Sequence, residues 1–276
     1  MSDAWDGRSY AEASAHHGAR DEWFLARHRP AVDARVVDLG CGSGEFTARL
    51  AELVPRGSVV GVDPDPSMVE AARRHRAPNL TFVDAPAQVL DQVVAPDSVD
   101  LVVSRATFHW VPLDDHVRCY EAVRAVLRPG GVFHAESGGA GNVDRLITVL
   151  DQAAGALGLS PASTTFLTAG TAFELLQQAG FAPGPEAVRT VAQRRPFTPE
   201  RLLEVIRTQS IHAYRVGADD LRSGFVVEVG RRFGGLRRPD GTWDQTFVRL
   251  EVLVERPSGQ RRRRHSVAGA EPDYRR

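Results

Sequence analysis

The feature that most constrains this chain is a glycine-rich turn between a short strand and a helix. Residues 36–47 read Val-Val-Asp-Leu-Gly-Cys-Gly-Ser-Gly-Glu-Phe-Thr, and helical spacing of apolar residues resumes over 46–54. This pattern predicts a buried strand, a turn and a helix in direct succession. Gly40, Gly42 and Gly44 carry no Cβ, so the backbone can turn sharply and approach a ligand closely. The helix start adds amide donors, and the turn is therefore predicted to hold a small molecule.

Several details argue against a phosphate-bearing ligand in this turn. A dinucleotide fingerprint would be G-x-G-x-x-G, but Glu45 occupies the place of the last glycine. Asp38 puts a carboxylate just before the first glycine, which suits a cationic ligand better than a pyrophosphate. The chain contains no lysine, and this excludes both a P-loop and chemistry through a lysine Schiff base.

Residues 38–44, Asp-Leu-Gly-Cys-Gly-Ser-Gly, resemble the cofactor loop of class I S-adenosylmethionine-dependent methyltransferases. Three further segments resemble that family in order and spacing: Val-Gly-Val-Asp at 60–63, Phe-Val-Asp-Ala at 82–85 and Val-Leu-Arg-Pro-Gly-Gly at 126–131. Residues 105–111, Arg-Ala-Thr-Phe-His-Trp-Val, resemble the small-molecule branch that includes trans-aconitate methyltransferase. The resemblance implies an α/β fold: a doubly wound, seven-stranded Rossmann-like sheet with helices on both faces and a helical lid. Its last strand would run antiparallel beside the fifth.

The composition argues against nucleic-acid and membrane partners and favours a reducing compartment. The formal net charge is −1, so no global field draws the chain to nucleic acid or to an anionic membrane. The N-terminus is unlike a signal peptide, and no apolar run approaches the ~18 residues of a membrane span. Cys41 and Cys119 are too few for a disulfide framework or a metal site. We therefore expect a cytoplasmic, metal-free monomer or homodimer that binds a small molecule, and arginine without lysine fits a GC-rich bacterial gene.

The second predicted strand, residues 58–62, delivers Asp63 at its carboxyl end, 23 positions after Gly40. An acid in this place can accept hydrogen bonds from both ribose hydroxyls of a nucleoside. It can also cap the following helix, although Asp65 or Ser67 is available for that role. The ribose contact is the interpretation we favour.

The resemblance assigns further residues to S-adenosylmethionine. Asp84, after the third strand, would receive the amine of adenine, and the amide of Ala85 would read a ring nitrogen. Met68 would lie against the adenine or simply pack in the core. Ser104, at the end of the fourth strand over 98–104, completes this set.

The N-terminal segment has two interpretations. Residues 4–29 carry apolar and aromatic side chains roughly on one helical face, which predicts one or two amphipathic helices. These helices would pack on the edge of the sheet or close over the cofactor and substrate. The resemblance implies the second role, with residues 1–30 as lid helices and the Tyr10 hydroxyl near the cofactor carboxylate.

The loop at 105–110 leaves the fourth strand where the winding of such a sheet reverses, and ligands bind at that crevice. Arg105, His109 and Trp110 are therefore expected to border the methyl acceptor. His109 is either a structural histidine or a general base for a hydroxyl acceptor. A carboxylate acceptor is already ionised, and Arg105 would then be its main partner. Glu136, at the end of the fifth strand, is expected on the surface rather than in the active site.

We expect one methyltransferase domain over residues 1–257. Within it, residues 31–136 would form the cofactor-binding core, and helices over 198–234 would cap the substrate. Residues 258–276 include four consecutive arginines, and they are predicted to form a disordered basic tail rather than a nucleic-acid contact.

Together these observations predict an S-adenosylmethionine-dependent methyltransferase for a small acceptor, with O-methylation of a carboxylate or hydroxyl favoured. Displacement at a sulfonium methyl needs alignment and exclusion of water more than acid–base catalysis. Two alternatives stay open: a module that binds S-adenosylmethionine without catalysis, and an NAD-dependent oxidoreductase.

Overall fold

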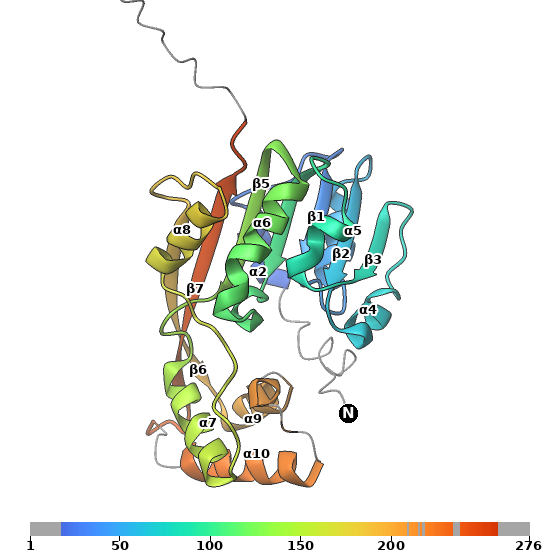
Figure 1. The fold of residues 1–276 in the computed structure, drawn as a ribbon. Coiled ribbons are helices and arrows are strands. Elements are labelled where there is room, and N and C mark those ends of the chain that lie inside the picture. The colour runs from blue at the N-terminus through green and yellow to red at the C-terminus, as the bar shows by residue number, and fades with distance from the viewer. Residues whose placement is uncertain (1–17, 209, 215, 217–218, 234–237, 259–276) are drawn as a thin grey trace, which may run out of the picture.

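The computed structural model describes residues 18–208, 210–214, 216, 219–233 and 238–258, and these form a mixed seven-stranded sheet with helices around it (Figure 1). The strands are β1 (Arg35–Leu39), β2 (Ser58–Asp63), β3 (Leu80–Asp84), β4 (Val99–Arg105), β5 (Leu127–Gly138), β6 (Val188–Phe197) and β7 (Trp243–Glu255). Their order is β3-β2-β1-β4-β5-β7-β6. Strands β1 to β5 are parallel, and β7 runs antiparallel between β5 and β6. The expected doubly wound Rossmann-like sheet is confirmed, including the antiparallel last strand.

Helices cover both faces of the sheet. One face carries α2 (Gly18–Leu25), α3 (Glu45–Leu53) and α4 (Pro66–Ala72), and the other carries α5 (Leu90–Val93), α6 (His116–Val126) and α8 (Ala169–Gln178). On β1, Val36 packs into the cluster that contains Phe24 and Leu50, while its neighbour Val37 packs into the cluster that contains Tyr120. Both faces of the parallel strands are thus buried, which explains their nearly continuous apolar sequences.

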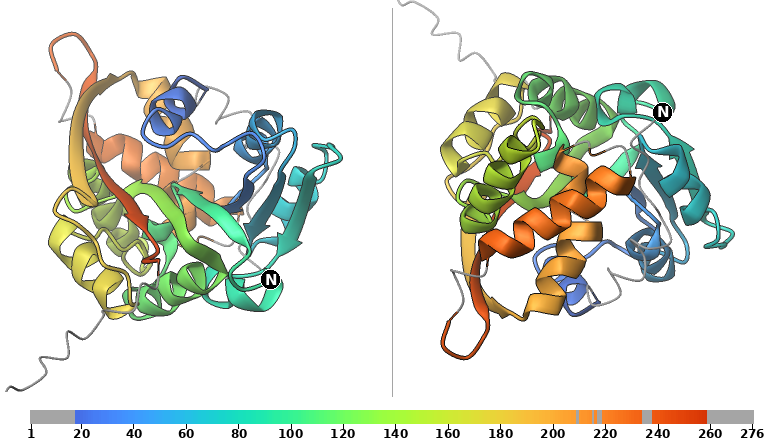
Figure 2. Two further views of the ribbon diagram at one scale, coloured as in Figure 1. Left: turned by 90° about the horizontal axis from the view of Figure 1, so that it is seen from above. Right: turned by 90° about the horizontal axis from the view of Figure 1, so that it is seen from below.

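A helical cap stands beyond the carboxyl ends of β4 and β5 (Figure 1). It contains α7 (Asp144–Ala156), α9 (Pro199–Thr208), the short 3-10 helix η5 (Ser210–Tyr214) and α10 (Asp219–Phe233). The first half of β7 pairs with β6 where β5 has already ended, so these two strands reach out to the cap. Leu150, Ile206, Phe225 and Trp243 belong to a hydrophobic cluster of the cap's own. Figure 2 shows α10 lying across the end of the molecule, next to α7 and α9.

One element differs from the expectation. The cap is larger than the helices predicted over 198–234, because α7 contributes Leu146, Val149 and Leu150 to its core. Strand β5 begins at Leu127, so the Arg-Pro-Gly-Gly sequence at 128–131 lies inside the strand, with a register shift against β4 and Gly130 at a φ of 77°.

The described part of the N-terminal region is α2, and it packs on the sheet. Phe24 and Leu25 are each 1% exposed, so the packing interpretation holds for this helix. Residues 1–17, including Tyr10, lie outside the described residues, as do residues 259–276 of the expected tail.

Candidate functional site

Three glycines with positive φ shape the turn between β1 and α3. The angle is 76° at Gly40, 53° at Gly42 and 87° at Gly44, a region that glycine adopts without steric strain. A Cβ at Gly40 would stand 2.1 Å from Oγ1 of Thr107 in the loop after β4. The turn and that loop are therefore in contact, with no space for a side chain between them.

The amides of the turn bind mostly within the protein. Gly40 donates to the Val62 carbonyl at 2.7 Å, and Gly42 donates to the Asp63 carboxylate at 2.9 Å. Gly44 is the N-cap of α3, and no side chain among the described residues caps this helix. The expected amide donors for a ligand are therefore those of the first turn of α3, rather than those of the glycines.

Asp63 lies beside the turn at the end of β2. Its Oδ2 accepts the bond from Gly42, and its Oδ1 accepts from the Asp65 amide at 3.0 Å. Each carboxylate oxygen has a second lone pair, so two acceptor positions remain for ligand hydroxyls. Burial raises the pKa of Asp63. Asp65 caps α4 by accepting from the amides of Ser67 and Met68 at 2.8 and 3.2 Å, which leaves Asp63 free of that role.

The acid at the end of β3 stands next to Asp63. Asp84 is exposed and is in register with Asp63 on the neighbouring strand. The Ala85 amide donates to the Asp63 carbonyl at 3.1 Å, so our prediction that it reads a ring nitrogen is wrong. Met68 is 4% exposed, which agrees with the packing interpretation of that side chain.

Asp38 is buried beneath the turn. It is 2% exposed, and its Oδ2 accepts a hydrogen bond from Thr47 Oγ1 at 2.7 Å. Burial raises the pKa of Asp38 to about 6, although Thr47 and the charge of Arg105 favour the ionised form. A carboxylate in such a place is stabilised by a cationic group on a ligand.

The raised pKa of Asp38 gives a testable consequence for stability. Between its unfolded pKa of 3.8 and its folded pKa of about 6, the folded protein binds the proton more tightly, so ionisation destabilises the fold as the pH rises. In the ligand-free protein, Asp38→Asn should therefore raise the free energy of unfolding by at most about 3 kcal/mol at pH 7.5. The gain should shrink as the pH falls through 6 toward 4. Urea unfolding at several pH values measures it, with the exposed Asp33→Asn as the matched control; a gain independent of pH would contradict the assignment.

Two hydroxyls tie β4 and its following loop to the turn. Ser104 Oγ donates to the Leu39 carbonyl at 2.8 Å, and Thr107 Oγ1 lies 3.3 Å from the same oxygen. Ser104 is 1% exposed, so it joins β4 to β1 and does not face a ligand as we predicted. Thr107 instead connects the glycine turn to the loop that borders the next feature.

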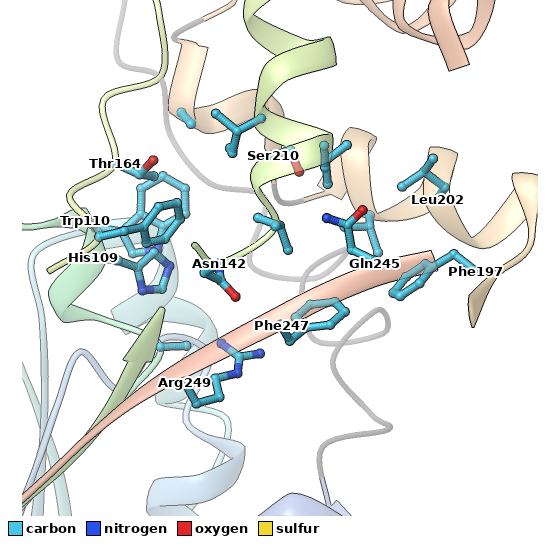
Figure 3. A pocket seen from close by; sticks show the side chains of 17 residues that line it. His109, Trp110, Asn142, Thr164, Phe197, Leu202, Ser210, Gln245, Phe247 and Arg249 are labelled. Carbon is cyan, nitrogen blue, oxygen red and sulfur yellow. The ribbon is translucent and has the colours of Figure 1, made fainter. Parts of the chain in front are cut away.

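A cavity of about 150 Å³ opens beside this loop, between the sheet and the cap (Figure 3). Its walls come from the loop after β4, the turn after β5, the first half of β7 and the cap. The polar and amphipathic residues in its lining are His109, Trp110, Asn142, Thr164, Ser210, Gln245 and Arg249.

The structure places His109 and Trp110 together in this lining, with ring centroids 5.2 Å apart. His109 Nδ1 accepts a hydrogen bond from the Gly138 amide at 3.4 Å. Burial and then the charge of Arg249 lower the pKa of His109 to about 3. The ring is therefore neutral at physiological pH, and because Nδ1 is an acceptor, its proton resides on Nε2. In this state His109 can donate a hydrogen bond but is a poor base.

Arg249 is a site residue that the sequence analysis missed. Its Nε lies 3.7 Å from Glu136 Oε1, and its guanidinium carbon lies 5.5 Å from the centre of the Phe247 ring. Glu136 is 4% exposed, which corrects our expectation of a surface acid. Gln245, Phe247 and Arg249 alternate along β7 and therefore share a face; a polar and aromatic face on a predicted strand was the signal available in the sequence.

Arg105, predicted to border the acceptor, does not line this cavity. It forms an ion pair with Asp21 of α2. Its guanidinium carbon lies 4.7 Å from the ring centre of Phe46 and 5.3 Å from that of Phe24. The prediction failed because the side chain of this strand-end residue turns to the face covered by α2 and α3.

Backbone strain also marks the cavity. Three non-glycine residues in the described ranges have positive φ, and two of them, Ala106 at 54° and Val143 at 49°, line the cavity. A β-branched residue such as Val143 rarely adopts this conformation. Strained backbone of this kind concentrates at ligand sites.

Among the residues with described positions, no group of three or more histidines, cysteines, aspartates or glutamates is arranged to hold a metal ion. No helix in those ranges combines the length and apolarity that crossing a membrane requires.

Residues 36–131 match the family model described as "Methyltransferase domain". A trans-aconitate 2-methyltransferase of Deinococcus radiodurans is 42% identical over 115 residues, which cover 42% of this chain and 41% of that protein. A protein of the same name from Methylobacterium radiotolerans is 29% identical over 257 residues, covering 84% of this chain and 94% of the relative. The stronger match is thus confined to less than half of the relative, whereas the weaker one runs nearly end to end.

Solved structures share the fold at low identity. Phosphoethanolamine N-methyltransferase 2 of Haemonchus contortus, in complex with S-adenosylhomocysteine, aligns with a TM-score of 0.58 and 17% identity over 91% of this chain and 57% of that chain. Geranyl diphosphate C-methyltransferase of Streptomyces coelicolor aligns with a TM-score of 0.54 and 13% identity over 91% and 83%. These neighbours act on different acceptors, so they inform on the fold alone.

Proposed function

We infer that this chain is a class I S-adenosylmethionine-dependent methyltransferase, and we propose that it methylates an oxygen of a small carboxylic acid. The family match over residues 36–131 and the similarity to trans-aconitate 2-methyltransferases support the reaction class. The neutral state of the His109 ring is the observation that favours a carboxylate over a hydroxyl acceptor. A poor base beside the cavity suits an acceptor that is already ionised, as a carboxylate is at neutral pH.

The residues around the glycine turn fit the proposed cofactor. Gly40 lets the loop that carries Thr107 pack directly on the turn, where a Cβ could not stand. Asp63 and Asp84 lie side by side at adjacent strand ends, placed to accept from ribose and from the adenine amine. Asp38, whose charge is disfavoured by burial, would be balanced by a cationic amino group. We propose these residues as the cofactor site.

S-adenosylmethionine, when bound, supplies a methyl group on a sulfonium. In the proposed reaction a carboxylate oxygen of the acceptor would form the new C–O bond as the C–S bond breaks, and the electron pair of that bond would stay on the sulfur. A carboxylate has no proton to lose in this step. The protein therefore needs to align the acceptor and exclude water, and His109 can orient it through the Nε2 hydrogen.

The direct test is transfer of a labelled methyl group from S-adenosylmethionine to a panel of carboxylic acids and phenols. We expect labelled methyl esters and no labelled phenyl ethers. Thermal shift with S-adenosylhomocysteine and with NAD separates the remaining alternatives, because a ligand of the folded state raises its melting temperature. Stabilisation by NAD alone would indicate an oxidoreductase, and stabilisation by S-adenosylhomocysteine without transfer to any acid would indicate a binding module.

The state of His109 predicts a pH profile. With a pKa of about 3, His109 stays neutral across the assay range, so kcat should show no limb near pH 6.5 with a carboxylate acceptor. His109→Gln retains a hydrogen-bond donor and should lower kcat by less than about tenfold. A large loss of kcat, together with loss of a limb near pH 6.5, would instead identify His109 as a general base.

We further propose that the enzyme works in a bacterial cytoplasm on a small molecule, as a monomer or homodimer, without a nucleic-acid or membrane partner. The net charge of −1 supports this, as do two cysteines that are both buried and free. Residues 1–257 would form one domain, with 31–136 holding the cofactor.

A further inference from the structure

The cavity carries a charged residue at one end and is mostly apolar along the rest of its length, where Thr164, Ser210 and Gln245 are the polar exceptions. His109, Asn142 and Arg249 lie near one another, and Leu202 and Phe197 lie at the opposite end (Figure 3). The walls between are formed by apolar side chains of the cap and the sheet: Leu146, Ile147, Leu202, Val205, Phe197 and Phe247. A ligand that fills this space is therefore expected to have one charged end and a mostly apolar body.

Arg249 gives the polar end a positive charge. Among the described residues that line the cavity, it alone is charged at neutral pH, since the His109 ring is neutral. Glu136 lies behind it, with its Oε1 3.7 Å from Nε of Arg249. The guanidinium of Arg249 also carries Nη donors, which can bind an anion in the cavity. A guanidinium binds a carboxylate with matched, charge-assisted hydrogen bonds.

The position of this end agrees with the chemistry. Ala106 and His109 line the cavity and belong to the loop after β4. Thr107 of the same loop contacts the glycine turn, because its side chain occupies the space that a Cβ on Gly40 would need. An acid held by Arg249 and His109 therefore presents its oxygen on the side of the cavity that borders the cofactor site. The apolar body then points into the cap.

We propose that the acceptor is an acid with a single carboxylate and an apolar, ring-sized body, and that Arg249 is the residue that recognises the carboxylate. This inference rests on the proposed function. A cavity of about 150 Å³ is of the order that accommodates benzene in a dry protein interior. A second or third carboxylate would have no further cationic partner among the described lining residues, and the neutral Thr164, Ser210 and Gln245 would offset its desolvation only in part. The proposed preference for a monocarboxylate therefore differs from a preference for a tricarboxylate such as trans-aconitate.

The first experiment uses the unmodified full chain with methyl-labelled S-adenosylmethionine. Trans-aconitate, cinnamate, cyclohexanecarboxylate and 4-methylpentanoate are compared as acceptors at equal concentrations. We expect kcat/KM to be at least about 100-fold higher for one or more of the monocarboxylates than for trans-aconitate. An equal or higher value for trans-aconitate would overturn the inference and leave the proposed function intact. No transfer to any acid, while S-adenosylhomocysteine still binds, would overturn both.

The second experiment tests Arg249 against a matched arginine. Arg195 also lies near the Phe247 ring, at 5.6 Å compared with 5.5 Å for Arg249, but it does not line the described cavity. Arg249→Gln should raise KM for the preferred acid about 10- to 100-fold and leave S-adenosylhomocysteine affinity unchanged, whereas Arg195→Gln should change neither. Equal effects of the two substitutions would refute the assignment of Arg249.

A third comparison guards against loss of folding. Arg249→Gln leaves the buried carboxylate of Glu136 with one guanidinium fewer, so the double variant Glu136→Gln/Arg249→Gln should be measured beside it. The double variant should show the same rise in KM. Leu202→Arg adds a cation at the apolar end and should lower the preference for monocarboxylates over diacids at least tenfold. An unchanged KM in the double variant, or an unchanged preference in Leu202→Arg, would contradict the proposed orientation.

Discussion

Gly40→Ala is expected to destabilise the protein by about 2–5 kcal/mol and to weaken S-adenosylhomocysteine binding at least about 100-fold. Two separate effects contribute. Alanine at a φ of 76° is strained by roughly 1–2 kcal/mol, and its Cβ would lie 2.1 Å from Oγ1 and 2.6 Å from Cβ of Thr107. The loop after β4 must then move, and with it the wall between the cofactor site and the cavity.

Gly158→Ala is the matched control for this prediction. Gly158 also has a positive φ, 70°, but an added Cβ there would meet no atom within 4 Å. Urea unfolding should therefore show only the conformational term for this variant, roughly 1–2 kcal/mol, and calorimetric titration should show unchanged cofactor affinity. If Gly40→Ala behaved like Gly158→Ala in both measurements, the close contact between the turn and Thr107 would not be important for binding.

Asp63→Ala is expected to lower S-adenosylhomocysteine affinity about 10²- to 10⁴-fold. The ribose would lose two charge-assisted hydrogen bonds, each about 1.5–3 kcal/mol. The substitution also removes the acceptor for the Gly42 amide, which loosens the turn itself. Both effects act in the same direction.

Asp65→Ala is the matched control for Asp63. Asp65 is two residues away and caps α4, so its loss should destabilise the fold by roughly 1 kcal/mol with little change in cofactor affinity. Isothermal titration with S-adenosylhomocysteine measures both variants. An affinity of Asp63→Ala within twofold of the unmodified protein would reject the ribose assignment.

The fold around the proposed cofactor site was predictable because its signals are local. The turn from β1 to α3 and the acids at the ends of β2 and β3 all follow from short sequence patterns, and parallel pairing then brings the strand ends together. Asp65 illustrates this: its capping role follows from two or three positions of sequence. Local patterns also predicted the strands at 58–62 and 98–104 to within one residue of β2 and β4 at each end.

The acceptor site was less predictable because its residues meet only through tertiary contacts. His109 and Arg249 are 140 positions apart in the sequence, and antiparallel pairing of β7 with β5 brings them to one cavity. Arg105 shows the same dependence on tertiary contacts. Its position at the end of a strand was predicted, but its ion pair with Asp21 directs the side chain toward α2 and away from the cavity. The share of α7 in the cap likewise depends on contacts with α10.

The separate hydrophobic cluster of the cap has an evolutionary consequence. Because Leu150, Ile206 and Phe225 pack with one another, while the sheet has clusters of its own, mutations that reshape the cap need not disturb the glycine turn. Selection could therefore change the proposed acid specificity through the cap without altering the proposed cofactor site. A recombination library that exchanges residues 142–166 and 197–249 with those of a trans-aconitate 2-methyltransferase should yield folded chimaeras that retain S-adenosylhomocysteine binding and differ in the acid they esterify.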